Sequence, residues 1–447
     1  MSTTPDTTAL VAELTELLGA RGVSVDAATR ERASVDGCAL SPVVSAKLPL
    51  GLADVVAYPA NAEQVALVVQ AAARHGVPVT PRGKGTGNYG QGIPMSDGLV
   101  LDLSRARAIV EVGDGFVTAE GGAVMAQIEN AAWAAGQQLL MYPSTAQSTL
   151  GGFLSGGSGG TGSIAHGVIA GGPFVIALDV VHADGAGLHH VTGDEAQEYL
   201  HNYGTAGVIA RATVALEPLQ PWRAFYASFD ADAFPAALDL LMPFADLEPT
   251  PRLVSTDLPT LADALPSNPG IPAGRVSLRG ILDEASVAAA TELVDAAGGR
   301  VELVTEGAKE VMRLSMISYN HPIEWLQKEY PGEYFHVEVG GTALIDRIDE
   351  VHDVYPGAML HAEAQKGRPI GMLAGRYESE EAVLAGMAAL GELGVHTHNP
   401  HQWFVDVRVE ETRARKAVTD PAGILNPGKL PEADAATNPL MYGKASA

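Results

Sequence analysis

Residues 81–92 read Pro-Arg-Gly-Lys-Gly-Thr-Gly-Asn-Tyr-Gly-Gln-Gly. Glycine has no Cβ, so the backbone N–H groups of this loop can converge on an anion at the close range that a pyrophosphate requires. The loop is not a P-loop, because Lys84 is followed by Gly85 and no glycine stands at the required upstream position. It is also not the dinucleotide fingerprint, because it does not open a helix. The alternative is a flexible surface turn.

The residues before this loop predict a strand–helix–strand unit, which disfavours the surface-turn alternative. Residues 54–59 form a short apolar run, and Asn61 is a helix-capping residue followed by an apolar stripe at helical spacing. Gly76 ends the helix, and residues 77–80 form the next strand. The loop therefore leaves the end of a strand inside a folded unit.

A second glycine-rich stretch reads Ser-Thr-Leu-Gly-Gly-Phe-Leu-Ser-Gly-Gly-Ser-Gly-Gly-Thr-Gly-Ser-Ile-Ala-His-Gly over residues 148–167. A linker is the alternative interpretation. Linkers do not usually carry Leu150, Phe153, Leu154 and Ile164 between their glycines. The apolar residues indicate a packed loop, and the glycines indicate a flat polar group lying against its backbone.

Composition excludes several classes of protein. The chain has 447 residues, 28 Lys and Arg against 53 Asp and Glu, and a formal charge of −25. This balance disfavours nucleic-acid and anionic-membrane partners, which both favour a basic surface. The one cysteine, Cys38, excludes an internal disulfide and a cysteine-rich zinc site. No apolar run reaches the roughly 20 residues of a membrane span, and Met1 is not followed by a basic and then apolar leader, so we expect a cytoplasmic protein.

The chain divides into sections by composition. We expect a first domain over residues 1–218, with a helix at 9–21 and a core at 50–218. Glycine then becomes sparse, and strand–helix–strand patterns repeat over 219–400, which predicts a second α+β domain. Residues 401–430 are expected to return to the first domain, and 431–447 to form a loose polar tail.

The ordered motifs resemble the FAD-binding oxidoreductases of the vanillyl-alcohol oxidase and p-cresol methylhydroxylase superfamily. The resemblance rests on both glycine-rich stretches and covers residues 50–220 and the region near 400–430. It is carried further by these segments: Val100-Leu-Asp-Leu-Ser104, Asp179-Val-Val-His-Ala-Asp-Gly185, Tyr203-Gly-Thr-Ala-Gly-Val-Ile209 and Gly423-Ile-Leu-Asn-Pro-Gly-Lys429.

The resemblance implies an α+β fold: a two-subdomain FAD-binding domain of the p-cresol methylhydroxylase type, capped by an α+β (ferredoxin-like) substrate domain. It also implies a role for each matched position. The pyrophosphate would lie on Gly83, Gly85, Thr86, Gly87 and Asn88, with Arg82 or Lys84 as cations. The ribityl chain and isoalloxazine would lie on Ser148, Thr149, Gly152, Gly159, Gly160 and Ser163. The adenosine would lie on Gly207 and Ile209, and Asn426 and Lys429 would lie near the flavin.

One departure from the family concerns the covalent tether that many members form with FAD. Asn88 and Tyr89 occupy the first tether position, and His166 is the only nucleophile in the second stretch, at a position where relatives often have Tyr. We therefore expect noncovalent FAD.

Histidines and carboxylates of the second domain are the candidates for catalysis. His336 and Glu338 alternate along one predicted strand, and His361 and Glu363 along another, so each pair shares a face. If the strands are neighbours, one sheet face carries all four as a substrate wall or a metal site; an exposed face is an equal alternative. We expect no metal, because the Gly-Asp-Gly-Asn signature of metal-binding relatives is missing.

Two further segments carry candidate bases. Tyr319-Asn320-His321 precedes Pro322, and its alternative is a histidine at a helix C-terminus. His401 precedes Trp403, and its alternative is a buried core histidine. By elimination we favour His321 and His401 as proton acceptors, with Tyr319 and Asn320 orienting the substrate.

The expected function is oxidation of a small alcohol, 2-hydroxy acid or similar donor by hydride transfer to flavin N5. Oxygen, a quinone or a redox protein would reoxidise the flavin. Two alternatives remain open: a redox-neutral, FAD-dependent group-transfer enzyme, and a non-catalytic flavin-binding protein.

Overall fold

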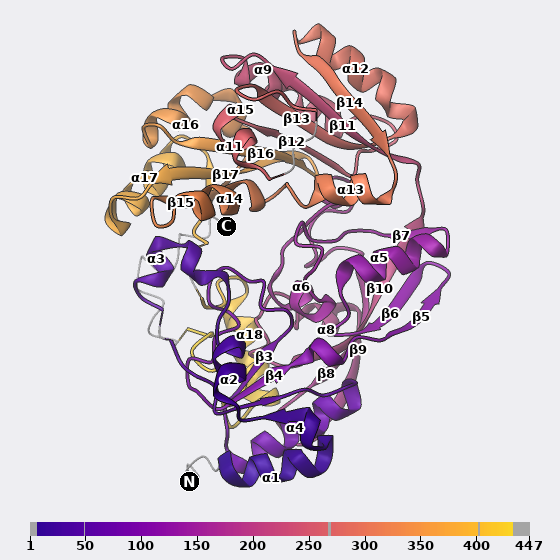
Figure 1. The fold of residues 1–447 in the computed structure, drawn as a ribbon, viewed down its shortest axis with the longest axis vertical. Coiled ribbons are helices and arrows are strands. Elements are labelled where there is room, and N and C mark those ends of the chain that lie inside the picture. The colour runs from indigo at the N-terminus through magenta and orange to yellow at the C-terminus, as the bar shows by residue number, and fades with distance from the viewer. Residues whose placement is uncertain (1–6, 49, 267–269, 401–402, 432–447) are drawn as a thin grey trace.

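The computed structural model describes residues 7–48, 50–266, 270–400 and 403–431. Figure 1 shows two parts stacked along the long axis, joined where β10 leads into β11. The lower part holds two sheets and the upper part holds a third. Within the described ranges, no helix combines the length and the apolar character needed to cross a membrane.

The first sheet has the strand order β1-β2-β4-β3, in which β2, β4 and β3 are parallel. Helix α4 connects β2 to β3 and is capped as the sequence predicts: Asn61 Oδ1 accepts the Gln64 N–H at 2.9 Å, and Gly76 ends the helix with φ 63°. The elements of this unit are α1 (Thr7–Leu18), β1 (Val23–Ser24), α2 (Ala27–Ala33), α3 (Pro42–Ser45), β2 (Val55–Ala57), α4 (Ala62–His75), β3 (Val79–Arg82) and β4 (Leu99–Asp102).

The second sheet is antiparallel, with the order β5-β6-β10-β8-β9 and β7 paired to β10. The sequence predicts a packed loop for the second glycine-rich stretch, but two short helices, α6 and α7, form within it. The elements are β5 (Ile109–Gly113), β6 (Phe116–Glu120), α5 (Met125–Ala134), β7 (Gln137–Leu139), α6 (Leu150–Gly156), α7 (Ser163–His166), β8 (Val175–Val181), β9 (Leu188–Thr192), α8 (Gly193–Gln197) and β10 (Val208–Pro218).

The third sheet has eight antiparallel strands in the order β14-β11-β13-β12-β16-β17-β15-β18. Each half is a β-α-β-β-α-β unit, which is the predicted ferredoxin-like pattern, and β12 pairs with β16 to join the halves. Its strands are β11 (Trp222–Phe229), β12 (Leu253–Asp257), β13 (Val276–Asp283), β14 (Arg300–Glu306), β15 (Tyr334–Gly340), β16 (Met359–Gln365), β17 (Arg368–Arg376) and β18 (His396–His398).

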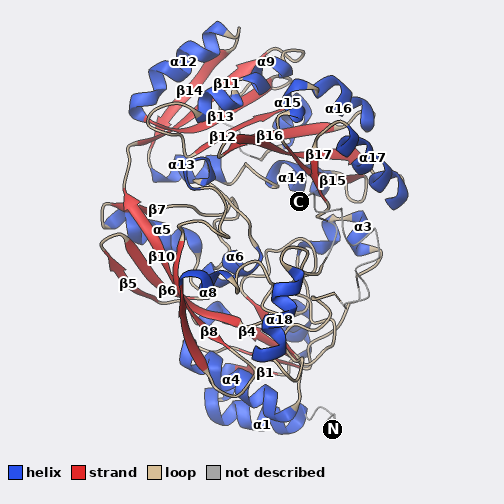
Figure 2. Cartoon of the chain, turned by 180° about the vertical axis from the view of Figure 1, so that it is seen from behind, coloured by secondary structure: helices blue, strands red, loops and turns tan. Residues whose placement is uncertain are grey.

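Helices cover the two faces of this sheet unequally. Those on the outer face bury the largest apolar core, whereas α13 and α14 lie on the side that faces the lower part (Figure 2). The inner face is thus left for a site between the two parts. The helices are α9 (Phe234–Asp239), α10 (Leu241–Ala245), α11 (Pro259–Ala264), α12 (Val287–Ala296), α13 (Ala308–Ser315), α14 (His321–Glu329), α15 (Ala343–Asp346), α16 (Ile348–Val354) and α17 (Glu380–Glu392).

The C-terminal segment lies against the first sheet. Helix α18 (Val409–Thr419) is followed by Leu425, which forms a parallel bridge with Val79 of β3. The Thr419 hydroxyl donates to the Ala206 carbonyl at 2.7 Å. The segment therefore packs behind the strand that leads into the first glycine-rich loop. The predicted loose tail, apart from Pro431, lies outside the described residues.

Candidate active site

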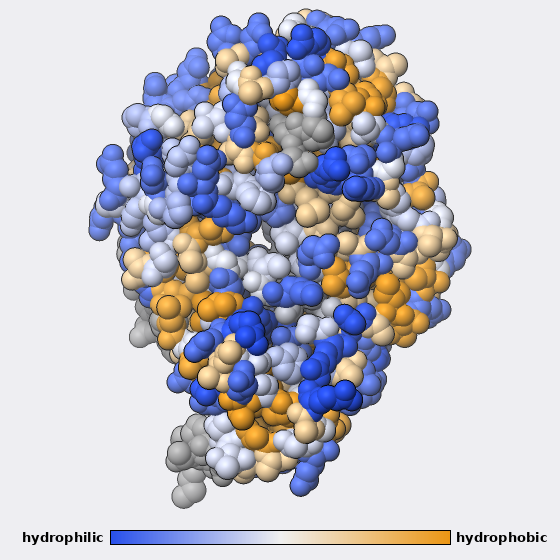
Figure 3. Space-filling model, in the orientation of Figure 1, coloured by the Kyte–Doolittle hydropathy of each residue, from blue (hydrophilic) through white to orange (hydrophobic). Residues whose placement is uncertain are grey.

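A cavity of about 590 Å³ lies between the two glycine-rich loops and the inner face of the third sheet. The space-filling view has an opening near its centre, between the upper and lower parts (Figure 3). Most of the residues that the sequence assigns to the cofactor line this cavity: Arg82, Gly83, Lys84, Gly85, Thr86, Gly87, Asn88, Tyr89, Ser148, Thr149, Gly152, Gly159 and Ile209.

The first loop follows β3 and presents its backbone to the cavity. Gly85 has φ 63°, a conformation that suits glycine. A Cβ at Gly83 would stand 2.1 Å from the Thr149 hydroxyl, so the two loops touch only because Gly83 has no side chain. Arg82 Nη1 is buried and has no hydrogen-bond partner among the described residues, and burial lowers the pKa of this guanidinium. An anion beside it would be stabilising, which fits a diphosphate.

The second loop meets the cavity at the start of α6. The Thr149 hydroxyl accepts the Gly152 N–H at 3.2 Å and caps the helix. The Ser148 hydroxyl is buried without a partner in the described part of the chain, and it lines the cavity. It is therefore available to a polar ligand.

Gly160, Ser163 and His166 do not line the cavity. The Gly160 N–H donates to the Ser163 hydroxyl at 3.0 Å, and a Cβ on Gly160 would stand 2.1 Å from the Tyr142 carbonyl oxygen. The structure therefore requires glycine there to let two backbone segments approach. His166 Nε2 lies 3.1 Å from Glu217.

Three other residues assigned to the cofactor also lie outside the cavity wall. Gly207 packs against Val180 and Tyr199. The Asn426 amide donates to the Tyr203 carbonyl at 2.7 Å, and Lys429 Nζ donates to the Gly90 carbonyl. Lys429 is fully buried, and burial lowers its pKa to about 7. Both C-terminal side chains hold the backbone around the first loop from behind.

Tyr319 and Asn320 reach the cavity from the segment before α14. Tyr319 has φ 55°, which is unusual for a residue with a side chain. Its N–H donates to Glu363 Oε1 at 2.7 Å, and its hydroxyl donates to the Gly160 carbonyl. These two bonds clamp the segment between the third sheet and the second loop.

His321 begins α14, so the alternative of a histidine at a helix C-terminus does not hold. Pro322, at the first turn, suits a helix start rather than an end. His321 Nδ1 lies 2.5 Å from the Met316 carbonyl and its Nε2 lies 3.0 Å from the Thr145 hydroxyl. Thr145 lines the cavity and His321 lies behind it. His401 lies outside the described residues.

The two His-x-Glu strands share a sheet face but are not neighbours, so the adjacency that the sequence considered does not occur. In a β-α-β-β-α-β unit the first strand pairs with the third, and β17 therefore lies between β15 and β16. Met372 of β17 pairs with Glu338 on one side and with His361 on the other. Glu338 reaches the cavity, whereas His361 and Glu363 do not.

His361 and Glu363 belong to a buried charged network. His361 Nδ1 lies 2.7 Å from Asp257 and its Nε2 lies 2.9 Å from Glu363, while Arg279 donates to Asp257. All four side chains are essentially inaccessible to solvent. Burial alone would lower the pKa of His361, but the two carboxylates outweigh burial and raise it to about 9. A ring with both nitrogens facing carboxylates is a poor proton acceptor.

Tyr89 lines the cavity and pairs with His336, a contact that the sequence does not reveal. Tyr89, at the end of the first loop, lies with its hydroxyl 2.8 Å from His336 Nε2, and Asn320 donates to the same hydroxyl at 3.4 Å. Burial lowers the pKa of His336 to about 4, so the imidazole is neutral at pH 7. Burial also raises the pKa of Tyr89 well above its ordinary value.

A second missed group lies around His398 on β18. Its Nδ1 lies 2.8 Å from Glu338 and its Nε2 lies 2.5 Å from Asp406. Burial opposes the charge, but Glu338 and Asp406 raise the pKa of His398 to about 11. His201 lies 3.7 Å from the other oxygen of Asp406. The His-rich composition of residues 396–401 was a signal for this group, but not for its partners.

Comparison with known proteins agrees with this geometry. Residues 53–189 match the family model described as FAD binding domain. This part of the chain is an FAD-binding domain.

Relatives of this chain include proteins named for 2-hydroxy acids. The chain is 30% identical over 173 residues to the D-lactate dehydrogenase of Archaeoglobus fulgidus, which covers 37% of this chain and 39% of the relative. It is 30% identical over 198 residues to glycolate oxidase subunit GlcD of Bacillus subtilis, covering 40% and 41%. These matches span about two fifths of each relative's length.

Solved structures match the FAD-binding domain and the upper part together. An alkyldihydroxyacetonephosphate synthase superposes with a TM-score of 0.74 over 96% of this chain and 86% of that chain, at 15% identity. A 4-ethylphenol oxidase from Gulosibacter chungangensis gives 0.65 over 96% and 98%, at 18% identity. This likeness concerns the fold, and it confirms the predicted α+β architecture.

Proposed function

We propose that this chain oxidises a small 2-hydroxy acid or related alcohol with FAD held noncovalently in the cavity. The observation that carries the proposal is the shared wall: loop 81–92 of the FAD-binding domain and polar side chains of the third sheet line one cavity. The relatives named D-lactate dehydrogenase and glycolate oxidase subunit support the substrate class. Residues 1–218 would bind the cofactor, 219–400 would cover it, and 401–430 would return to brace the first loop.

The residues at the cavity fit the proposed cofactor. Arg82 Nη1 and the Ser148 hydroxyl have no hydrogen-bond partner among the residues that the structure describes. Arg82 and the glycine backbone would hold the diphosphate, and Ser148 would bind a polar atom of the cofactor. When bound, FAD would accept a hydride from the C–H bond that carries the substrate hydroxyl. Noncovalent attachment is favoured because His166 is engaged with Glu217 away from the cavity, and Asn88 and Tyr89 stand at the other tether position.

The proton of the substrate hydroxyl would pass to the Tyr89–His336 pair. Tyr89 Oη would accept the proton while its own proton moves to His336 Nε2, 2.8 Å away. A neutral imidazole has the lone pair that this relay needs. His321 would act only through Thr145, and His401 stays a further candidate from the sequence. Asn320, which donates to the Tyr89 hydroxyl, would orient that oxygen.

Arg368 is the proposed partner of the substrate carboxylate. It begins β17, lines the cavity, and makes no ion pair with a described carboxylate. A guanidinium can bind a carboxylate through two parallel hydrogen bonds. Such a contact would favour 2-hydroxy acids over uncharged alcohols.

Anaerobic reduction of the bound flavin tests the oxidoreductase proposal. D-lactate, L-lactate, glycolate and an uncharged alcohol of equal size are added separately, and loss of the yellow flavin absorbance is followed by stopped flow. We expect a 2-hydroxy acid to bleach the flavin fastest. Bleaching by none of them would contradict the proposal and favour group transfer or a non-catalytic role. Where a donor does bleach the flavin, the reduced protein is mixed with oxygen, a quinone or a redox protein to find which of them reoxidises it.

Two variants test the proposed roles at the cavity. Tyr89→Phe should slow flavin reduction about 100-fold or more while FAD content stays unchanged. Arg368→Gln should raise the KM for the hydroxy acid more than it lowers kcat. Arg376→Gln is the matched control for Arg368, because it stands at the other end of the same strand and pairs with Glu333. Wild-type kinetics in the first two variants would place the relay and the carboxylate site elsewhere.

A further inference from the structure

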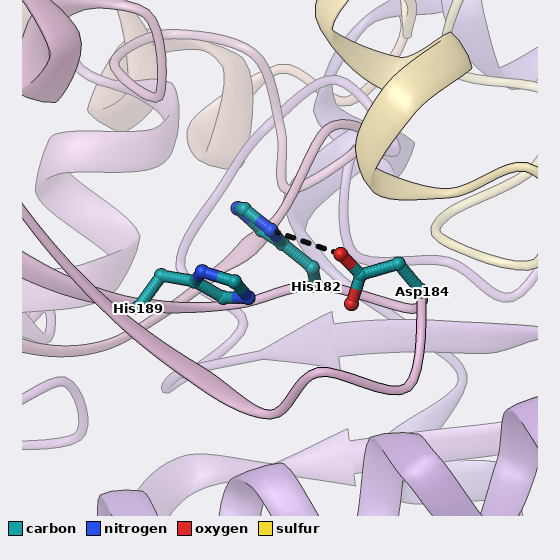
Figure 4. A group of neighbouring side chains, drawn as sticks. All are labelled: His182, Asp184 and His189. Atoms are coloured by element: carbon teal, nitrogen blue, oxygen red, sulfur yellow. Dashed lines mark ion pairs between the residues drawn. The ribbon is translucent and has the colours of Figure 1, made fainter.

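Three potential metal ligands come together on the β8–β9 hairpin, away from the cavity. Ligand atoms of His182, Asp184 and His189 all lie within 4.8 Å of one another. None of the three lines the cavity. Figure 4 shows both histidines beside the turn, with Asp184 facing His182.

The strand register explains why these side chains meet. Val180 pairs with His189, and Asp179 pairs with His190. His182 stands two residues after Val180 and therefore on the same face as His189, as a diagonal neighbour within reach of a ring. His190 points to the opposite face, where it lies 2.7 Å from Asp179.

The distances suit a metal ion. His182 Nδ1 lies 3.6 Å from Asp184 Oδ2, close to the separation of about 3.4 Å between two ligands of a tetrahedral zinc ion. The other oxygen of Asp184 accepts the Ala186 N–H at 2.9 Å, which orients the carboxylate. About a quarter of the Asp184 side chain is exposed, so an ion can enter from solvent.

The surroundings hold the histidines in a ligand-competent state. His182 is buried, and its Nε2 lies 2.8 Å from the Tyr199 hydroxyl, so Nε2–H can donate outward while Nδ1 faces Asp184. The His189 ring stacks on His182 with centroids 4.0 Å apart. His189 Nε2 is buried and makes no hydrogen bond with any described residue. Ring stacking alone would leave this nitrogen desolvated and unsatisfied.

We propose that His182, Asp184 and His189 bind one divalent transition-metal ion such as Zn²⁺, with water completing the coordination. Two imidazoles and one carboxylate suit Zn²⁺ and similar divalent transition-metal ions rather than Mg²⁺ or Ca²⁺. The ion would link the two strands across the hairpin turn. It would have no part in hydride transfer, because its ligands do not reach the cavity wall.

The test is a titration of untagged, FAD-loaded protein with ZnCl₂ after treatment with a chelator and its removal. Isothermal calorimetry should give one zinc ion per chain, and the thermal midpoint should rise with zinc. MgCl₂ at the same concentration should leave both unchanged. No binding by the wild-type chain would overturn the proposal.

Variants locate the ion without relying on activity. Asp184→Asn and His189→Ala should weaken zinc binding more than about 100-fold, and Tyr199→Phe about 10-fold or more through loss of ring orientation. His190→Ala is the matched control and should bind like wild type. Circular dichroism and FAD content verify that each variant is folded. Wild-type affinity in both ligand variants would show that the ion binds elsewhere and would overturn the assignment.

Discussion

The buried network around His361 makes Asp257→Asn a sharp test of the packing inside the third sheet. Asp257 accepts from Arg279 and Ser277 and lies 2.7 Å from His361. The substitution keeps the shape of the side chain but removes the negative charge. Arg279 then remains fully buried without its counter-charge.

The expected cost follows from the burial and from the pKa of His361. Removing one partner of a buried ion pair costs about 3–5 kcal/mol. Independently, the His361 pKa is raised from 6.5 to about 9, and 2.5 units correspond to about 3 kcal/mol. We therefore expect the free energy of unfolding to fall by roughly 3–5 kcal/mol at pH 6.

The sign of the pH dependence is also determined. A histidine whose pKa is raised by folding stabilises the protein fully below its unfolded pKa of 6.5. That contribution is lost as the pH rises through 9, the pKa in the folded protein. The difference in stability between wild type and Asp257→Asn should therefore be largest near pH 6 and shrink toward pH 10.

Urea unfolding followed by circular dichroism at several pH values measures both effects. If the free energy of unfolding falls by about 2 kcal/mol per molar urea, the urea midpoint of Asp257→Asn at pH 6 should be roughly 2 M below that of wild type. The matched control is Glu284→Gln, because Glu284 pairs with Arg223 at the surface and is 62% exposed. A midpoint shift no larger than that of the control, or a difference that grows with pH, would refute the reasoning.

Three further predictions concern the cofactor and the proton acceptor. Gly85→Val should abolish FAD retention, because its φ of 63° and the close approach of the anion require glycine. The control Gly115→Val, at a turn with φ 79° and open space around it, should retain FAD. Equal FAD retention in both variants would show that loop 81–92 does not bind the cofactor. Acid or heat should release free FAD from a yellow protein, and flavin that stays on the denatured chain would disprove noncovalent binding. His321→Ala should slow anaerobic flavin reduction less than Tyr89→Phe does, because His321 reaches the cavity only through Thr145. A loss of about 100-fold in His321→Ala or His401→Ala, with a normal rate in Tyr89→Phe, would move the proton acceptor from Tyr89 to that histidine.

Local signals account for what could be predicted in the FAD-binding domain. A cap at Asn61 and a left-handed glycine at Gly76 act within one helix, and both are found as predicted. The glycine content of loop 81–92 predicts that its backbone binds an anion, and the loop lines the cavity. Each of these features depends on residues that are close in the chain, which is why the sequence alone reveals them.

Interpretation from sequence failed where distant residues decide the chemistry. The sequence offered His361 as part of a substrate wall, a metal site or an exposed face, but Asp257, 104 positions away, occupies one ring nitrogen. His336 was one member of a possible histidine face, but its partner Tyr89 lies 247 positions away. Strand β17 lies between β15, which carries His336, and β16, which carries His361. No residue pattern within β15 or β16 predicts this strand order.

The sequence by itself indicated a diphosphate site, because a backbone nest for an anion is a local property of glycine-rich loops after a strand; FAD as its ligand was implied by the family resemblance. It also determined the alternation that puts His336 with Glu338, and His361 with Glu363, on one face of each strand. Only the tertiary structure decided which of these side chains are exposed to solvent, which form ion pairs and which are neutral. Strand order and burial set the partners and the dielectric around each titratable group, and these control proton affinity more strongly than residue type does.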